Sequence, residues 1–238
     1  MLRSLLYFIK LVSYWLLFFT LYRIIFLLVY PSKTPVGKFY ESLKIFYYSL
    51  RLDFATIAYL ITIPLILWAF QQFMKSNLLN RINHFYNLFM ISVITLLCIS
   101  NIAMYGEWNS LISFNTLYYL VSPAKVFPYM TTLELIGVCL GVAVIISVFV
   151  LLFRVLILMV IPYSTGKILY KIIILPVIFP VVFFTMRGGL QQMPINESFS
   201  CFSQVLFFDN VSINPAWHLG RMTVIAMDKQ DEPPTEKK

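Results

Sequence analysis

The sequence predicts an all-α integral membrane protein, and three observations support that class. Of the 238 residues, 60% are hydrophobic and only 12% are charged, whereas about a quarter of the residues in a soluble domain are charged. The apolar runs reach the roughly 20 residues that a helix needs to cross a bilayer core about 30 Å thick. They also lack the alternation of polar and apolar residues that strands of a membrane barrel show.

Five apolar segments are long enough to span a membrane. We expect these helices at about residues 4–30, 54–73, 85–104, 135–153 and 168–186. The first contains Lys10 and Arg23, the second and third carry no charge, and Pro176 and Pro180 should kink the fifth. The first run is longer than the apolar region of a cleaved signal peptide, and no small-residue cleavage site follows it. We therefore expect it to remain as the first membrane anchor.

Five spans place the two termini on opposite sides of the membrane. Seven Lys and Arg residues and no acidic residue fall on the N-terminal side, while the other side holds 11 basic residues and all 10 acidic ones. Acidic residues count for little in the positive-inside rule, and four basic residues between the first two spans weaken the bias. We favour a cytoplasmic N-terminus and an extracytoplasmic C-terminus.

Two connecting segments on the outer side have patterns of their own. In residues 38–52, apolar side chains recur at helical spacing with Lys, Glu and Ser off the stripe, which predicts a helix lying in the membrane interface. Residues 105–130 are too polar to span but rich in Tyr and Phe, and we interpret them as an interfacial or re-entrant element.

Residues 187–221 follow the last span as a polar and aromatic linker, and a short tail at 222–238, expected to be flexible, comes after it. The linker opens with Arg187, Gly188 and Gly189, and two glycines permit positive φ and close backbone approach. The alternatives are a flexible exit turn and a fixed turn that directs the linker along the membrane. We favour the fixed turn, because the apolar residues at 205–208 need a surface to pack on.

No catalytic, cofactor-binding or metal-binding constellation is present in the sequence. The two histidines, His84 and His218, fall on opposite sides of the membrane in the five-span arrangement. No acidic residue stands in the ten positions before His84, and only Asp209 does before His218. The sequence has no glycine-rich phosphate loop and no nucleophile elbow. The net charge of +8 is scattered over the ends of apolar runs, so a nucleic-acid footprint is not expected.

A few charged residues are candidates for contacts with lipid headgroups. Charges inside a span are functional hypotheses by default, although Lys10 and Arg23 lie close enough to a span end to reach the interface. Arg51 and Asp53 open the second span, where Asp53 could equally cap the helix. Arg187 ends the fifth span at phosphate level. We name Arg23, Arg51, Asp53 and Arg187 as possible lipid-headgroup or structural contacts.

Four pieces of sequence together resemble the membrane domain of the lipoteichoic acid synthase-like family, within the alkaline phosphatase/sulfatase superfamily. These pieces are RLDF at 51–54, EWNSLISFNTLYYLVSPAKVF at 107–127, RGGLQQMPIN at 187–196 and NPAWHLG at 214–220. The resemblance covers about residues 16–221 and is nearest to the versions found in Bacteroides-type bacteria. RGGLQ, followed by Pro-Ile and a later Asn-Pro-x-Trp, is a fairly specific string, whereas RLDF alone is weak.

The resemblance implies five membrane helices in the bacterial cytoplasmic membrane, followed by an extracytoplasmic domain that transfers phosphoglycerol or phosphoethanolamine from a membrane lipid. In that family the catalytic domain carries a Thr nucleophile and a divalent metal such as Mn or Mg. The motifs for both are missing from these 238 residues, so we expect a membrane anchor that is inactive alone, with membrane phospholipid and a separately encoded catalytic domain as partners. The alternative is a self-standing lipid-binding or partner-docking protein. A transporter ranks last, because the second and third spans contain no charge.

Overall fold

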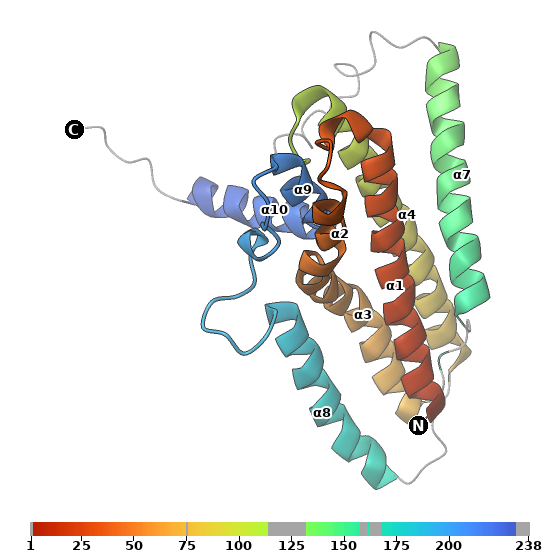
Figure 1. The fold of residues 1–238 in the computed structure, drawn as a ribbon. Coiled ribbons are helices and arrows are strands. Elements are labelled where there is room, and N and C mark those ends of the chain that lie inside the picture. Colours follow the sequence, from red (N-terminus) through yellow and green to blue (C-terminus); the bar gives the residue numbers. More distant parts are fainter. Residues whose placement is uncertain (1, 75, 114–131, 158–160, 162–167, 232–238) are drawn as a thin grey trace.

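The computed structural model describes residues 2–74, 76–113, 132–157, 161 and 168–231 of the chain, and every regular element in these ranges is helical. The long helices are α1 (Leu2–Val29), α3 (Leu50–Phe73), α4 (Asn77–Trp108), α7 (Thr132–Leu156) and α8 (Ile168–Arg187). Successive long helices alternate in direction, and the N-terminus lies at the opposite end of the bundle from the short helices (Figure 1).

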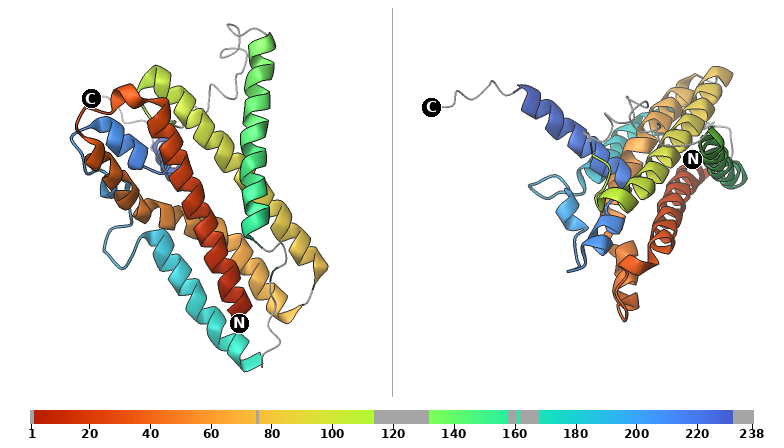
Figure 2. Two further views of the ribbon diagram at one scale, coloured as in Figure 1. Left: turned by 45° about the vertical axis from the view of Figure 1, so that its right-hand side comes forward. Right: turned by 90° about the horizontal axis from the view of Figure 1, so that it is seen from above.

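The short helices gather at one end of the bundle, which we call the cap end. They are η1 (Pro31–Lys33), α2 (Phe39–Tyr48), η2 (Glu197–Phe199), α9 (Leu206–Ser212) and α10 (Pro215–Asp231). Residues 188–214, which join α8 to α10 and contain η2 and α9, are called the cap segment below. Seen from above, α10 leaves the bundle sideways (Figure 2).

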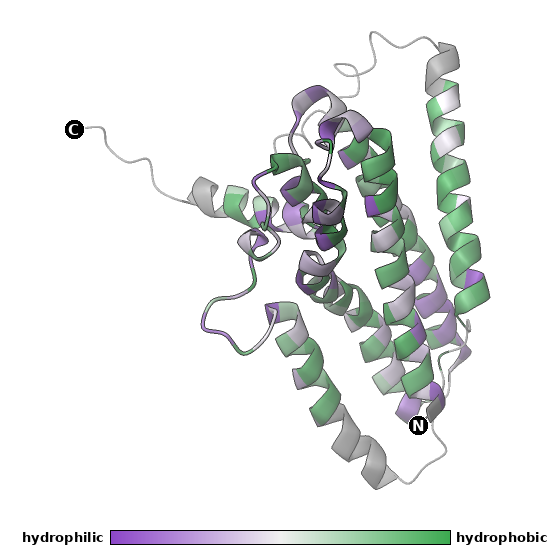
Figure 3. Ribbon diagram, in the orientation of Figure 1, coloured by the Kyte–Doolittle hydropathy of each residue, from purple (hydrophilic) through white to green (hydrophobic). Residues whose placement is uncertain are grey.

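Four helical segments among the described residues are long and apolar enough to cross a membrane, and together they indicate a multi-pass membrane protein. They are Arg3–Val29, Phe39–Phe73, Asn77–Trp108 and Ile136–Leu156. Hydrophobic residues colour most of the length of α1 and α7 (Figure 3). Helix α8 covers the residues of the fifth expected span, and its segment Pro176–Arg187 is apolar but by itself shorter than a membrane span. The count of five therefore stays a prediction.

The helices are longer than the apolar runs that predicted them, most clearly in α4. That helix begins eight residues before the expected residue 85, because the Ser76 hydroxyl accepts from the Leu78 amide at 3.2 Å and caps it. It ends at Trp108, and the C-cap residue Asn109, with a left-handed backbone (φ 52°), closes the last turn. Of the aromatic segment 105–130, residues 114–130 lie outside the described ranges.

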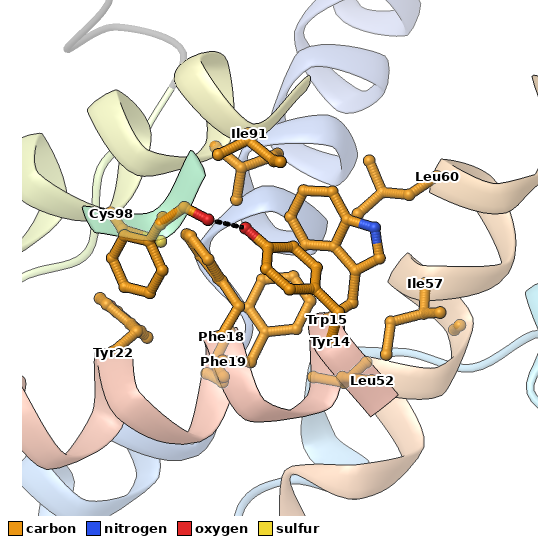
Figure 4. Close-up of a cluster of buried hydrophobic side chains, with 14 of the residues drawn as sticks. Tyr14, Trp15, Phe18, Phe19, Tyr22, Leu52, Ile57, Leu60, Ile91 and Cys98 are labelled. Carbon is orange, nitrogen blue, oxygen red and sulfur yellow. Dashed lines mark hydrogen bonds between the residues drawn. The ribbon is translucent and has the colours of Figure 1, made fainter. Parts of the chain in front are cut away.

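Aromatic side chains of α1 form the centre of the core, against α3 and α4 (Figure 4). Phe19, Leu52 and Ile91 are fully buried there, one from each of the three helices. The buried α1 residue Tyr14 also reaches α7, because its hydroxyl donates to the carbonyl of Phe149 at 3.0 Å. Since lipid tails are as apolar as these side chains, interlocking ring contacts and such hydrogen bonds stabilise the bundle more than exclusion of water does.

Candidate functional site

A buried ion pair joins α1 to α3 at the cap end. Arg23 lies near the end of α1 and Asp53 in the first turn of α3. The two guanidinium nitrogens Nη1 and Nη2 of Arg23 each donate to one carboxylate oxygen of Asp53 at 2.8 Å. The side chains are only 1% and 3% exposed. A two-point contact of this kind is the strongest geometry available to the pair. It compensates both charges away from solvent, while Arg23 Nε has no hydrogen-bond partner among the described residues.

The cap segment covers this ion pair and bonds to both of its members. Arg23 donates to the Ser212 carbonyl at 3.2 Å, and the Asn214 amide donates to Asp53 Oδ1 at 2.8 Å. The Asn214 side-chain oxygen meanwhile accepts from the amides of Ala216 and Trp217 at the start of α10. Asn214 is fully buried, so one side chain caps α10 and attaches that helix to the ion pair.

The rest of the cap segment is anchored on α2 and α4. Ser200 donates to the Tyr48 carbonyl at 3.2 Å, and the ring of Phe202 stacks on Tyr48 with 4.7 Å between centroids. The amide of Asn210 donates to the Tyr105 hydroxyl on α4 at 3.2 Å. The cap segment is therefore a packed layer on the end of the bundle.

The Arg187-Gly188-Gly189 turn is fixed by its hydrogen bonds, as expected. The Gly188 amide donates to Thr185 and the Gly189 amide to Phe184, which is the Schellman arrangement of bonds at a helix end. Gly188 has φ +84°, and a Cβ at that position would lie 2.4 Å from the Cβ of Ile195. The Ile195 amide donates to the Arg187 carbonyl at 2.9 Å and closes the loop. Only glycine fits this place.

The four residues named from the sequence separate into two groups. Arg23 and Asp53 bind each other, and their burial leaves no room for a lipid headgroup between them. Asp53 does not act as a helix cap; its carboxylate accepts from Arg23 and Asn214 instead. Arg51 is exposed and donates to Gly188 O and Gln191 Oε1, while Arg187 is half-buried and donates to Gln192 O.

Sequence reasoning missed the part played by Asn214. The Asn-Pro pair at 214–215 could have identified the start of a helix, because Asn is a favoured N-cap and Pro a favoured first residue. Helix α10 then continues to Asp231, where we expected a flexible tail from residue 222. The capped start and the absence of proline between Pro215 and Pro233 favour a continuous helix over residues 222–231.

The described residues contain one further, part-buried pair of titratable groups at the cap. His218 Nδ1 lies 2.9 Å from Glu197 Oε1, which connects α10 to η2. Within the described part of the chain, no group of three or more His, Cys, Asp or Glu residues is placed to hold a metal ion. This pair is best understood as a link between two parts of the cap.

Three of the four pieces of sequence that carry the family resemblance thus contact each other. Arg51 of RLDF binds Gly188 and Gln191 of RGGLQQ, and Asp53 of the same piece binds Asn214 of NPAW. The fourth piece lies mostly outside the described residues. Comparison of the chain with protein-family models, curated proteins and solved structures finds no match.

Proposed function

We propose that this chain is the membrane-anchor portion of a lipoteichoic acid synthase-like transferase, acting at the outer face of a bacterial cytoplasmic membrane. The observation that carries the proposal is the meeting of RLDF, RGGLQQ and NPAW in one cap. Residues 137 and 161 positions apart in the chain form that contact, so these pieces of sequence work as one structural unit. Such a unit provides a rigid attachment for an extracytoplasmic domain, which loop residues alone would not.

The proposal includes five spans, a cytoplasmic N-terminus and an extracytoplasmic cap. The alternating long helices support it, since an odd number of spans separates the N-terminus from the cap (Figure 1). Helix α2 would lie in the outer interface: Phe39, Tyr40 and Tyr47 are 67%, 82% and 73% exposed, and Ser42 and Ile45 on its other side are buried. Exposed aromatic rings are typical of that zone.

Thiol labelling tests the orientation. Cys201 is exposed in the cap segment, so a variant that retains only this cysteine should react with a membrane-impermeant maleimide on intact cells. The matched control is Asn77→Cys in a cysteine-free chain, because Asn77 is exposed at the opposite end of the bundle. It should react only after permeabilisation. The reverse result at the two positions would overturn the proposed orientation.

A headgroup-release assay tests the catalytic part of the proposal. The motifs that carry the nucleophile and the divalent metal in the family are missing from these 238 residues, so the purified chain should release no headgroup from vesicles of phosphatidylglycerol or phosphatidylethanolamine supplied with Mn²⁺ or Mg²⁺. Release that depends on the metal and stops with a chelator would contradict an anchor-only role.

A second candidate function is a self-standing docking protein, favoured by the completeness of the cap. The cap segment is packed on the bundle by contacts within this chain alone, so it already presents a formed surface. This alternative expects co-purification of a separate extracytoplasmic protein. Substitution of exposed cap residues such as Leu190 and Met193, 83% and 74% exposed, should abolish the association without disturbing the buried ion pair; retained association would count against it.

A further inference from the structure

A stripe of exposed basic and aromatic side chains runs from α2 into α3. Ser49, between the two helices, has helical backbone angles (φ −72°, ψ −24°), so the helical spacing of side chains continues across the junction. Lys44, Tyr47 and Arg51 therefore follow one another on one side at intervals of three and four residues. All three are exposed, Tyr47 to 73%.

Arg187 comes to the same place from α8. Arg51 donates to the Gly188 carbonyl at 3.2 Å and to Gln191 Oε1 at 2.6 Å, and Arg187 donates to the Gln192 carbonyl at 2.9 Å. The two guanidinium groups thus both donate to the same short loop, residues 188–192. Arg51 also lies over the ring of Phe199, 4.4 Å from its centroid, which limits the positions that its side chain can take.

These cations are not neutralised within the described part of the chain. The ion pairs found there are Arg23–Asp53, Lys38–Glu41 and His218–Glu197, so neither Arg51 nor Arg187 has a carboxylate within 4.0 Å. Each arginine uses only its Nη2 nitrogen in the hydrogen bonds found among those residues. The remaining N–H groups of both arginines are available to an external acceptor.

We propose that Arg51 and Arg187, flanked by Lys44, bind the phosphate of an anionic phospholipid such as phosphatidylglycerol. The planar fork of Arg matches phosphate oxygens, and two uncompensated charges favour an anionic headgroup over a zwitterionic one. The source is a lipid because the cations border apolar surface: Phe54 on α3 and Phe183 on α8 are 40% and 60% exposed. Helices α3 and α8 pack together, so acyl chains can lie along both.

Lipid retention tests the site. The chain is reconstituted in vesicles of phosphatidylglycerol and phosphatidylcholine, extracted in mild detergent and examined by native mass spectrometry. The wild-type chain should retain phosphatidylglycerol in preference to phosphatidylcholine. R51Q/R187Q should lower that retention about tenfold or more, because each lost charge-assisted contact weakens binding severalfold. R187Q alone, which removes one loop contact only, should lower it severalfold.

Two control variants separate charge from structure. R154Q removes an exposed Arg from α7, near the opposite end of the bundle, and Q191A removes an acceptor of Arg51 while keeping both cations. Both should retain phosphatidylglycerol like wild type. Unchanged retention in R51Q/R187Q and in R187Q would overturn the site, as would an equal loss in R154Q. Displacement by millimolar glycerol phosphate would overturn the lipid as the ligand in favour of a soluble anion.

This inference rests on the proposed placement of the cap end at a membrane surface, and not on the transferase assignment. The two fail in different experiments: cysteine labelling and headgroup release test the proposed function, while lipid retention tests the arginine site. A chain with the reverse orientation would still be expected to retain phosphatidylglycerol through Arg51 and Arg187.

Discussion

Arg23 carries its charge about two turns from the end of a membrane helix, where an isolated guanidinium is costly. Asp53 accepts a hydrogen bond from each terminal nitrogen of Arg23. The cap segment supplies a carbonyl to Arg23 and an amide to Asp53. A buried pair of this kind adds little to the free energy of unfolding. Removing one member is nevertheless strongly destabilising, because the other member is left buried and uncompensated. The main effect of the ion pair is to specify that α1, α3 and the cap segment pack together.

Substitution of Asp53 should therefore be far more harmful than loss of an exposed ion pair. We expect Asp53→Ala to lower the free energy of unfolding by about 3–5 kcal/mol. The matched control is Lys38→Gln, which breaks the partly exposed Lys38–Glu41 pair, 37% and 26% exposed, and should cost less than about 1 kcal/mol. Chemical unfolding in detergent, followed by circular dichroism, measures both. Equal effects would show that the buried pair has no special role.

Cys201 is exposed, yet its surroundings hold back its reactivity. Partial burial, followed by the nearby Asp209 and Glu197, raises the pKa of the Cys201 thiol above its ordinary value. Because the thiolate is the reactive form, a raised pKa moves the rise in alkylation rate to higher pH. The folded chain with Cys201 as its only cysteine should show this shift relative to the same chain denatured in detergent. Coinciding pH profiles would refute the expected effect of the fold on this thiol.

Among the elements, the turn after α8 depends most strongly on residue type. Gly188 combines a left-handed backbone with contact against Ile195, and the loop that it begins supplies both acceptors of Arg51. A side chain at position 188 has to displace Ile195, which is 2% exposed. A substitution at this turn therefore also disturbs the start of α3, because Arg51 donates hydrogen bonds to the loop.

We expect Gly188→Ala to destabilise the cap by several kcal/mol, since strain at positive φ adds to the steric conflict. Gly220→Ala is the control, because nothing lies within 4 Å of its added Cβ and Ala is favoured over Gly within a helix by up to about 1 kcal/mol. Limited proteolysis measures the result. Cleavage within residues 188–199 should increase in the first variant only, and an equal response in both would contradict the account of the turn.

The elements were predictable from sequence to the extent that local pattern determines them. Apolar length identified the long helices, and the aromatic stripe at 38–52 identified α2. The ends of helices were less accurate, because capping by Ser76 and Asn214 extends helices into polar sequence. Ser and Asn are favoured N-cap residues, so the sequence did contain a signal for these two helix starts. The polar composition around them outweighed it.

At the scale of the whole molecule, cap and bundle are one folded unit. The cap segment contacts α1, α2, α3 and α4, and four of its residues between 207 and 214 are buried hydrophobics: Phe207, Phe208, Val211 and Ile213. A flexible stalk would expose those side chains. Residues 188–214 of the linker expected at 187–221 therefore form a packed layer, from which α10 extends.

Hydrogen exchange can test this unity. Amides of α9 should exchange slowly, like those of the adjoining part of α1, because their opening requires disruption of the buried core. In Asp53→Asn, which leaves Arg23 without a counter-charge, α9 and the first turn of α10 should lose protection together while α7 is unchanged. Rapid exchange of α9 in the wild-type chain would mean that the cap is only loosely attached.

The long-range pairing is the part that sequence could not provide. Arg51 lies only two residues from Asp53 in the sequence, but the two side chains turn to different sides of α3 and bind different parts of the cap. Arg23 lies 30 residues from Asp53, and Asn214 lies 161 residues from it. Charge sign alone does not choose among such partners, because the choice depends on how the helices pack.

The order in which the ribosome makes these partners has a consequence for biogenesis. Arg23 and Asp53 leave the ribosome early, but the Asn214 amide is made 161 residues after Asp53 and the Ser212 carbonyl 189 residues after Arg23. Until then, the pair lies at the end of the bundle without its cover. Maturation of this protein is therefore completed only when its late-synthesised region reaches the same side of the bilayer, and a chain stalled before Asn214 would present membrane proteases with an uncovered polar defect.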